Sequence, residues 1–272
     1  LGLTVIHKVP AVRYALKAQS VGVDMVSIVG AECGGHPGLD MIGSFVNGAM
    51  AGDALDIPFL IGGGVGHGSQ LIAALDAANE DAGALLHGFG ARAGDRIVIL
   101  SENSAAAIAM LFACWQKSMI AIPVNARQSA AELARILEHA RPAVVVMTSA
   151  ISDEAAAHAK RLSAVAYTGR FGGIHAATPY ASNPEADDRI AVLLYTTGTT
   201  GAPKGVILSH QNLRFGGQTS AHLRAMTQDD LVYGVLPITH VFGLASIVVA
   251  ATYAGAAIRL EARFSAAKLH AA

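Results

Sequence analysis

The sequence contains few cysteines, few charged residues and no excess of either charge sign. Its 272 residues include 2 cysteines, Cys33 and Cys114, which stand far apart and lack the spacing of a metal site. The 19 Lys and Arg residues balance 20 Asp and Glu residues, so there is no electrostatic case for a nucleic-acid partner or an anionic membrane. A chain of this length has ample core without disulfides, and its first residues do not show the basic, apolar and small-residue order of a signal peptide. We therefore expect a reduced, cytoplasmic setting and no metal site.

One long uncharged run needs a separate explanation. The run from Leu231 to Ile258, "LVYGVLPITHVFGLASIVVAATYAGAAI", is longer than the ~20 apolar residues that a membrane-spanning helix needs. However, Pro237 and His240 interrupt it, Ala and Gly are frequent in it, and no basic cluster flanks it. The pattern favours a buried strand, turn and helix over a membrane span.

Glycine is distributed unevenly along the chain. Residues 1–77 hold nearly half of the 29 glycines and carry more acidic than basic residues, whereas the remainder is close to neutral and poorer in glycine. This shift predicts two domains of different origin, residues 1–77 and 78–272.

The first segment alternates between short apolar runs and one helical pattern. The runs "LTVIHKV", "VDMVSIVG" and "IPFLIGGGVGHG" read as strands, and "PAVRYALKAQSVG" reads as a helix that starts at Pro10 and ends at Gly22. This order predicts a parallel sheet with crossover helices.

Two loops of the first segment could carry chemistry. "AECGGHPG" places His36 and Cys33 between glycines after a strand, and Gly62, Gly63 and Gly64 leave backbone amides open to a phosphate. Neither pattern is specific alone. From spacing alone, we favour a tight turn with a surface histidine, followed by a flexible loop.

The string "HKVPAVRYALKAQSVGVDMVSIVGAECGGHPG", with the later "IPFLIGGGVGHG", resembles part of the nitronate monooxygenase (2-nitropropane dioxygenase-like) family of flavin-dependent (β/α)8 barrels. The resemblance, over residues ~1–75, implies that His36 is the catalytic base and that Gly63 and Gly64 lie near the FMN phosphate. His67 and Ser69 depart from the family's common Asp and Arg. Three strands cannot close a barrel, so we expect a partial TIM-barrel segment, an incomplete FMN site and unpaired sheet edges that favour self-association.

The second segment has the regular alternation of a doubly wound α/β sheet. We predict strands at 96–100, 120–125, 143–149 and 190–196, and helices at 105–119 and 129–142. Residues 168–190 carry turn formers and no period, which predicts a long surface loop.

The last of these strands ends in "YTTGTTGAPKGV". Backbone amides and hydroxyl groups in such a loop can converge on a polyphosphate, and a lysine adds a mobile positive charge. The predicted phosphate-binding residues are Thr196, Thr197, Gly198, Thr199, Thr200, Gly201 and Lys204. The spacing is not that of a Walker-type P-loop, and a Gly/Thr-rich turn is the alternative interpretation.

This string is very similar to the phosphate loop of the AMP-forming adenylating superfamily, which includes acyl-CoA synthetases. "LPITHVFGL" and "RAGDRIVILSENS" extend the resemblance over residues ~79–272. It implies a ligase that uses ATP with Mg²⁺ to adenylate a small carboxylic acid and then transfers the acyl group to coenzyme A. Lys204 would bind the leaving pyrophosphate, and His240 would lie between the acyl pocket and the thiol entrance. Thr239 replaces a common aromatic residue before that histidine.

The family's adenine-binding segment, its magnesium-binding glutamate and its mobile carboxy-terminal domain would all lie beyond Ala272. We therefore expect both domains to be incomplete, with the ligase chemistry incomplete in this chain. Two alternatives stay open at this point. One is a fusion derived from a flavin-dependent nitronate monooxygenase, and the other is a catalytically silent fragment that at most binds nucleotide.

Overall fold

The computed structural model describes residues 5–29, 47, 50–52, 54–62, 68–169, 171–196 and 203–263. Its contacts divide the chain into two compact units, which we call unit 1 (Leu1–Leu71) and unit 2 (Ile72–Ala272). The division falls within helix α3 (Gly68–Gly88), which continues into unit 2. The domain boundary at residue 77, which composition predicts, stays a prediction.

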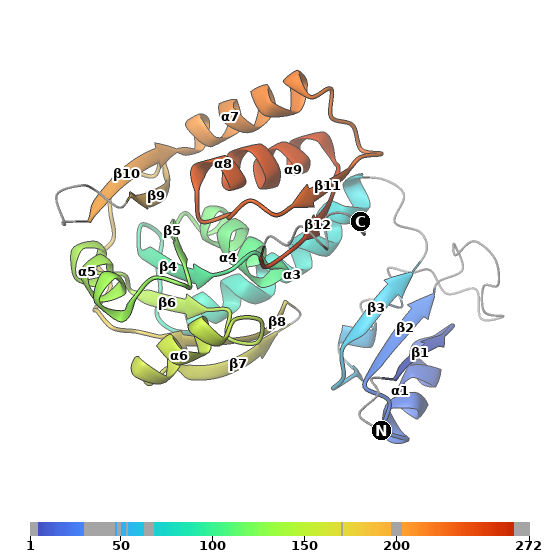
Figure 1. The fold of residues 1–272 in the computed structure, drawn as a ribbon. Helices are drawn as coiled ribbons and strands as arrows, with labels where there is room; N and C mark the ends of the chain where they lie inside the picture. Colours follow the sequence, from blue (N-terminus) through green and yellow to red (C-terminus); the bar gives the residue numbers. More distant parts are fainter. Residues whose placement is uncertain are drawn as a thin grey trace. The chain divides into compact units, whose positions relative to one another are not determined.

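Unit 1 contains a three-stranded parallel sheet with a crossover helix, as the sequence predicts (Figure 1). The order β1-β2-β3 follows the chain, with His7 opposite Val26 and Ile28 opposite Ile61. The elements are β1 (Ile6–Val9), α1 (Val12–Ser20), β2 (Met25–Val29) and β3 (Phe59–Gly62). The (β/α)8 barrel and self-association through the sheet edges stay predictions.

Helix α1 packs one apolar side against this small sheet. Val12, Ala15 and Ala18 recur at helical spacing and are buried against Val26 and Ile28. The helix stops where Gly22 adopts a φ of 87°, a conformation that glycine reaches without steric cost.

Unit 2 is built on a seven-stranded sheet of order β10-β9-β5-β4-β6-β8-β7. Strands β9, β5, β4 and β6 are parallel, whereas β10, β8 and β7 add antiparallel edges. The strands are β4 (Arg96–Ser101), β5 (Ile120–Asn125), β6 (Val144–Met147), β7 (Val165–Gly169), β8 (Gly172–Ala177), β9 (Ile190–Thr196) and β10 (Lys204–Ser209). The helices between them are α4 (Ala105–Gln116), α5 (Ala130–Ala140) and α6 (Asp153–Arg161).

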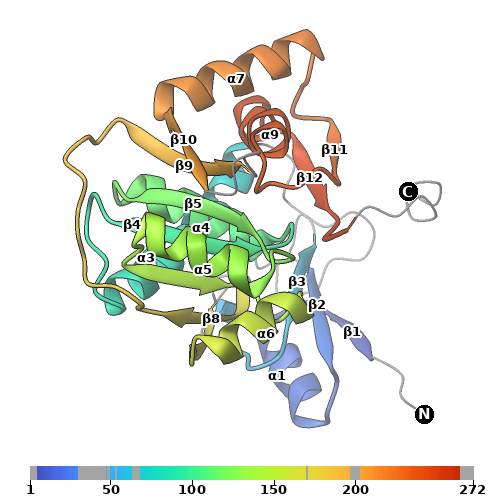
Figure 2. The ribbon, with the colours of Figure 1, turned by 60° about the vertical axis from the view of Figure 1, so that its left-hand side comes forward.

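Helices cover both faces of this sheet, which confirms the doubly wound pattern for the central strands (Figure 2). Ile97 and Ile99 of β4 pack with α3 and α4, and Val98 and Leu100 pack with α5 and α6. A strand buried on both faces explains why "RIVIL" reads as a continuous apolar run rather than an alternating one.

The long surface loop predicted for residues 168–190 is wrong in its first part. Strand β8 lies there and pairs with both β6 and β7, while Ile174 and Ala176 are buried. The strand "GGIHAA" has two glycines and only one β-branched residue, so its composition gives little β signal. Its pairing with β6 outweighs that weak local preference.

The uncharged run that starts at residue 231 forms a strand, a turn and helical segments, in the predicted order, and ends in a second strand. Strand β11 (Leu231–Gly234) pairs in parallel with β12 (Ala257–Leu260). Between them lie α8 (Val241–Gly243), the π-helix η1 (Leu244–Val249) and α9 (Ala250–Ala254). Helix α7 (His210–Leu223) packs on η1 and α9. Among the described residues, no helix is both long enough and apolar enough to span a membrane.

Candidate functional site

The strand pair β9–β10 carries the ends of the predicted phosphate loop. Thr196 is the last residue of β9, Lys204 is the first of β10, and the two lie directly opposite each other in the antiparallel ladder. Both side chains are exposed. The register therefore holds the predicted lysine beside the first predicted threonine, at the base of the segment that joins the two strands.

The position of β9 in the sheet gives this hairpin its place in the fold. Because β9 runs parallel to β5, and β5 runs parallel to β4, the carboxyl ends of all three strands lie at one edge of the sheet. In open α/β sheets, ligands bind outside the carboxyl ends of the strands, where successive strands depart to opposite sides. Strand β4 is such a point, because β5 and β6 lie on either side of it.

A cleft of about 330 Å³ opens at this edge. It is lined by Ser101 at the end of β4, Asn125 at the end of β5, and Arg127. Its other wall contains Leu236, Pro237 and Thr239 of the "LPITHVFGL" motif, together with Arg263 after β12. The fold therefore places the second sequence motif next to the carboxyl ends of the central strands.

A larger open hollow of about 780 Å³ lies elsewhere, around Arg189, His210 and Arg214 at the start of α7. We favour the smaller cleft as the functional one, because it combines the strand ends with a recognised motif.

Two buried hydroxyl groups near the strand ends lack hydrogen-bond partners. The Ser101 Oγ lines the cleft, and the Thr148 Oγ1 follows β6, the neighbouring strand. Both residues are almost completely buried. Buried polar groups are nearly always paired, with protein or with water, so these two atoms are free to accept a partner.

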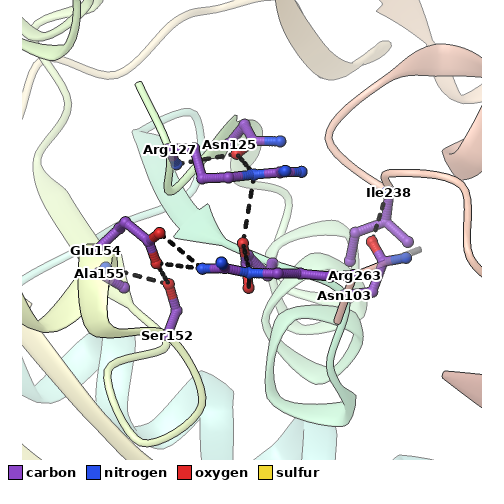
Figure 3. Close-up of polar contacts among 9 residues, drawn as sticks. Asn103, Asn125, Arg127, Ser152, Glu154, Ala155, Ile238 and Arg263 are labelled. Carbon is purple, nitrogen blue, oxygen red and sulfur yellow. Dashed lines mark hydrogen bonds and ion pairs between the residues drawn. The ribbon is translucent and has the colours of Figure 1, made fainter. Parts of the chain in front are cut away.

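Charged side chains form a network beside the cleft (Figure 3). The buried carboxylate of Glu102 accepts two bonds from the Arg263 Nε, at 3.0 and 3.2 Å, and lies 3.4 Å from the Arg127 Nε. The same Arg263 guanidinium reaches Glu154 at 2.5 and 2.7 Å. Arg263 therefore links the β4–α4 turn to the start of α6.

These contacts shift the pKa values of Arg263 and Glu154 so that each group is more strongly held in its charged form. Hydrogen bonds to Glu102, and then to Glu154, raise the pKa of Arg263. Hydrogen bonding to its own backbone amide, and then to Arg263, lowers the pKa of Glu154. Both shifts favour the charged forms, so the network holds its ionised state at neutral pH.

His240 caps the short helix α8 and is exposed to solvent. Its Nδ1 accepts a hydrogen bond of 3.2 Å from the Phe242 backbone N–H. A ring nitrogen that accepts such a bond carries no proton, so the neutral imidazole bears its proton on Nε2. His240 is thereby prepared to donate from Nε2. Among the hydrogen bonds and ion pairs of the described residues, none joins His240 to Lys204.

Tyr195 lies near the end of β9, directly before the predicted phosphate loop, and it contacts helix α5. Its hydroxyl lies 2.7 Å from the Nδ1 of His139 on α5, and the two rings meet edge to face at 5.7 Å. Burial raises the pKa of Tyr195, so the phenol stays protonated at neutral pH.

Several predicted site residues lie outside the described part of the chain. These are His36, Gly63 and Gly64 of unit 1, and Thr197, Gly198, Thr199, Thr200 and Gly201 of the phosphate loop. Their predicted roles stay predictions. Among the described residues, no group of three or more His, Cys, Asp or Glu side chains could hold a metal ion.

Sequence reasoning did not identify Glu102, Asn103, Arg127 or Arg263. Glu102 and Asn103 belong to the string "RAGDRIVILSENS", where a carboxylate and an amide directly follow a buried strand. That local signal could have identified these two residues. Nothing local connects them to Arg263, more than 150 residues later along the chain.

One family model and several individual proteins are similar to this chain. The AMP-binding enzyme family matches residues 72–272. Crotonobetaine/carnitine–CoA ligase from Escherichia coli is 30% identical over 199 residues, which cover 67% of this chain and 38% of that enzyme. The chain thus spans well under half the length of this curated relative.

Two solved structures resemble the fold. ATP-bound MatB from Rhodopseudomonas palustris superposes with a TM-score of 0.58 at 29% identity, over 72% of this chain and 41% of that one. The o-succinylbenzoate CoA synthetase MenE from Bacillus subtilis, in complex with its acyl-adenylate intermediate, gives 0.56 at 26% identity, over 73% and 52%. Since the family match extends over the whole of unit 2, the chain belongs to the AMP-binding enzyme family.

Proposed function

We propose that unit 2 contributes to an AMP-forming ligase that activates a carboxylic acid with ATP. In the first step the acid's carboxylate oxygen attacks the α-phosphorus of Mg-ATP, the bond to the β-phosphate oxygen breaks, and pyrophosphate leaves. In the second step the thiol of coenzyme A loses its proton and attacks the acyl carbon, and AMP leaves. The products are a thioester, AMP and pyrophosphate.

The phosphate loop has the first role in this proposal. Residues 196–201 and Lys204 would bind the β- and γ-phosphates and stabilise the charge that develops on the departing pyrophosphate. This task needs positioning and charge neutralisation rather than covalent chemistry. The observation that carries the proposal is the pairing of Lys204 with Thr196 across β9 and β10, at the carboxyl edge of the parallel strands.

The segment 236–240 has the second role. His240 would lie between the acyl pocket and the entrance for the thiol, with its Nε2–H available to a substrate oxygen. The cleft beside this segment, of about 330 Å³, is of the size that holds part of a small ligand. Thr239 lines that cleft where the superfamily commonly has an aromatic residue, so we expect a pocket of altered shape.

The relatives named above act on crotonobetaine or carnitine and on o-succinylbenzoate, which differ in charge and size. The panel of acids used to test the proposal therefore covers both kinds of acid.

We further propose that unit 1 derives from a flavin-dependent nitronate monooxygenase. The sequential parallel order β1-β2-β3, with α1 as a crossover, is the local pattern of a (β/α) barrel. His36 would remove a proton from the carbon beside the nitro group of the substrate, and bound FMN would supply the electron acceptor for the resulting nitronate. Purified protein that titrates with FMN, and loses this binding when Gly63 and Gly64 are replaced by valine, would support the proposal. Protein that does not bind FMN would overturn it.

Carboxylate-dependent exchange of pyrophosphate into ATP tests the proposed ligase directly, because only the first step is required. The purified chain is assayed with a panel of acids that includes crotonobetaine, o-succinylbenzoate, and short aliphatic and aromatic acids. We expect exchange that depends on one class of acid. Folded protein that exchanges with no acid would contradict adenylation by this chain and would favour a silent nucleotide-binding fragment.

A further inference from the structure

Asn103 lies in the turn between β4 and α4 and is almost completely buried. The next residue, Ser104, caps α4 by accepting a hydrogen bond of 3.1 Å from the Ala107 backbone N–H. The buried strand β4 precedes this turn and helix α4 follows it, so the backbone is fixed before and after Asn103. An amide at this place has a well-determined position.

The Asn103 side chain holds a distant segment through three hydrogen bonds. Its Nδ2 donates to the carbonyl oxygens of Gly234 and Leu236, at 3.1 and 2.9 Å. Its Oδ1 accepts from the Ile238 backbone N–H at 2.9 Å, a contact drawn in Figure 3. Both amide protons and the amide oxygen are therefore used, over sequence separations of 131–135 residues.

The held segment leads directly to His240. The Pro237 carbonyl accepts from the His240 backbone N–H at 3.0 Å, and the His240 carbonyl accepts from the Leu244 N–H at 2.9 Å. Gly243 packs so closely that an added Cβ would overlap the Pro237 carbonyl oxygen. The backbone around the imidazole is thus fixed on both sides, and its Nδ1 stays with the Phe242 N–H.

We infer that Asn103 is a positioning residue for His240: its three hydrogen bonds fix residues 234–238, and this fixes the imidazole as an Nε2–H donor. The inference rests on the proposed function for its effect on catalysis, but the placement of the imidazole can be measured without activity. Asn103 also lines the cleft of about 330 Å³, and the role inferred for it is to hold residues 234–238 rather than to bind a substrate. Its hydrogen bonds hold the segment before His240 at a fixed position relative to the β4–α4 turn.

Replacement of Asn103 by Asp tests the inference with little change of shape. Aspartate keeps an acceptor for Ile238 but loses both donors, so the Leu236 carbonyl loses its bond from Asn103 and the Gly234 carbonyl keeps only its bond from the Glu261 N–H, at 3.1 Å. Asn103→Ser, which also lacks both amide donors and adds no charge, takes its place if Asn103→Asp does not fold. Ser182→Ala is the matched control, because it removes hydrogen bonds of 2.8 and 2.9 Å to the buried Asp95, away from residues 234–240.

The first measurement is the ¹⁵N spectrum of the histidine rings in the full chain, with the His240 signals assigned from His240→Gln. We expect the Nε2–H tautomer of neutral His240 in the wild type and in Ser182→Ala, and averaged ring-nitrogen shifts in Asn103→Asp. Gly243→Ala disturbs the same turn from the opposite side and should also give averaged shifts. A tautomer mixture in the wild type, or an unchanged Nε2–H tautomer in the folded Asn103 variant, would overturn the inference.

The second measurement is the kinetics of carboxylate-dependent ATP–pyrophosphate exchange. We expect Asn103→Asp to raise the KM for the acid about tenfold, while the KM for ATP stays within about twofold, since a displacement near His240 leaves the β9–β10 hairpin in place. Equal rises in both KM values would indicate a general structural defect and overturn the positioning role. If the wild type itself shows no exchange, the proposed function fails, and the ring-nitrogen spectra alone decide the role of Asn103.

Discussion

Strands β4 and β10 belong to one sheet but differ in how they are enclosed. Residues Ile97–Leu100 of β4 have no exposed surface, and the turn after the strand contains Asn103, which hydrogen-bonds to a segment more than 130 residues away. In β10, an antiparallel edge strand of the sheet, Ile207 is 59% exposed and Lys204 is also exposed. The buried interior of the sheet therefore holds distant segments in place, whereas its β10 edge presents the positive charge of Lys204 to solvent.

Matched substitutions of isoleucine test the comparison most strongly. Ile99→Ala removes buried methyl and methylene groups from the centre of the sheet, so we expect the free energy of unfolding of unit 2 to fall by about 2–5 kcal/mol. Ile207→Ala on the exposed edge should lower it by less than about 1 kcal/mol. Trp115, the single tryptophan, belongs to unit 2, so its fluorescence during urea unfolding reports on this unit.

Similar losses of unfolding free energy in Ile99→Ala and Ile207→Ala would contradict the difference in burial between β4 and β10. A large effect of Ile207→Ala would mean that the β10 edge is covered in solution, and the dependence of unfolding on protein concentration would then reveal self-association.

Two adjacent glycines of α7 give a sharper test of packing next to the edge. A Cβ added at Gly217 would overlap the Val249 side chain, whereas one at Gly216 would lie 3.5 Å from the Ala245 Cβ, an ordinary contact. We expect Gly217→Ala to destabilise unit 2 by about 1–3 kcal/mol through overpacking. Gly216→Ala should stabilise it by up to about 1 kcal/mol, because alanine favours the helix. Urea unfolding of both variants measures the difference, and equal signs would show that α7 does not pack on η1 as described.

The contact between Tyr195 and His139 should have a smaller effect. We expect a double-mutant cycle of Tyr195→Phe and His139→Ala to give a coupling free energy of about 1 kcal/mol, because phenylalanine keeps the ring but loses the hydrogen bond. Tyr180→Phe, whose ring lies 4.9 Å from the Arg141 guanidinium, serves as a control with little expected change. A coupling energy near zero would mean that α5 does not hold the end of β9.

Asp187 and Arg189, just before β9, should give the smallest effect. Hydrogen bonds from Arg189 lower the pKa of Asp187 to about 2. A carboxylate with a lowered folded-state pKa stabilises the protein above its ordinary pKa of about 4, and this contribution disappears as the pH falls toward about 2.

Asp187→Asn should therefore flatten the loss of stability between pH about 4 and about 2, with only a slight effect at pH 7 because the pair is exposed. Urea midpoints measured across this pH range check the expectation. Acid unfolding curves that are parallel in the wild type and the variant would show that the ion pair does not form in solution.

The parts of the fold that depend on local sequence could be predicted. The central strands read as apolar runs because both faces are buried, and α5 was recognisable because its leucines and isoleucine recur at helical spacing. Ser129 and Glu132 form a capping box at its start, which is also a local pattern. The phosphate-binding role of residues 196–201 and Lys204 rests on residue type and stays a prediction, to which the structure adds only that Lys204 pairs with Thr196.

The parts that depend on distant partners could not be predicted. Strand β8 exists because β6 offers an open edge, and its own composition gives little sign of it. The contacts of Glu102 with Arg263, and of Asn103 with residues 234–238, join segments separated by 131–161 residues. Neither charge pattern nor periodicity specifies such pairs in a single sequence.

The most direct test of the account is carboxylate-dependent ATP–pyrophosphate exchange by the wild type, Lys204→Ala and Lys160→Ala. Lys160 is an exposed lysine on α6 and serves as the matched control. We predict that Lys204→Ala lowers the exchange rate by at least about 100-fold with unchanged folding, because it removes a charge that stabilises the leaving pyrophosphate. Lys160→Ala should exchange like the wild type. Exchange by Lys204→Ala at the wild-type rate would contradict the assignment of the β9–β10 hairpin as the phosphate site.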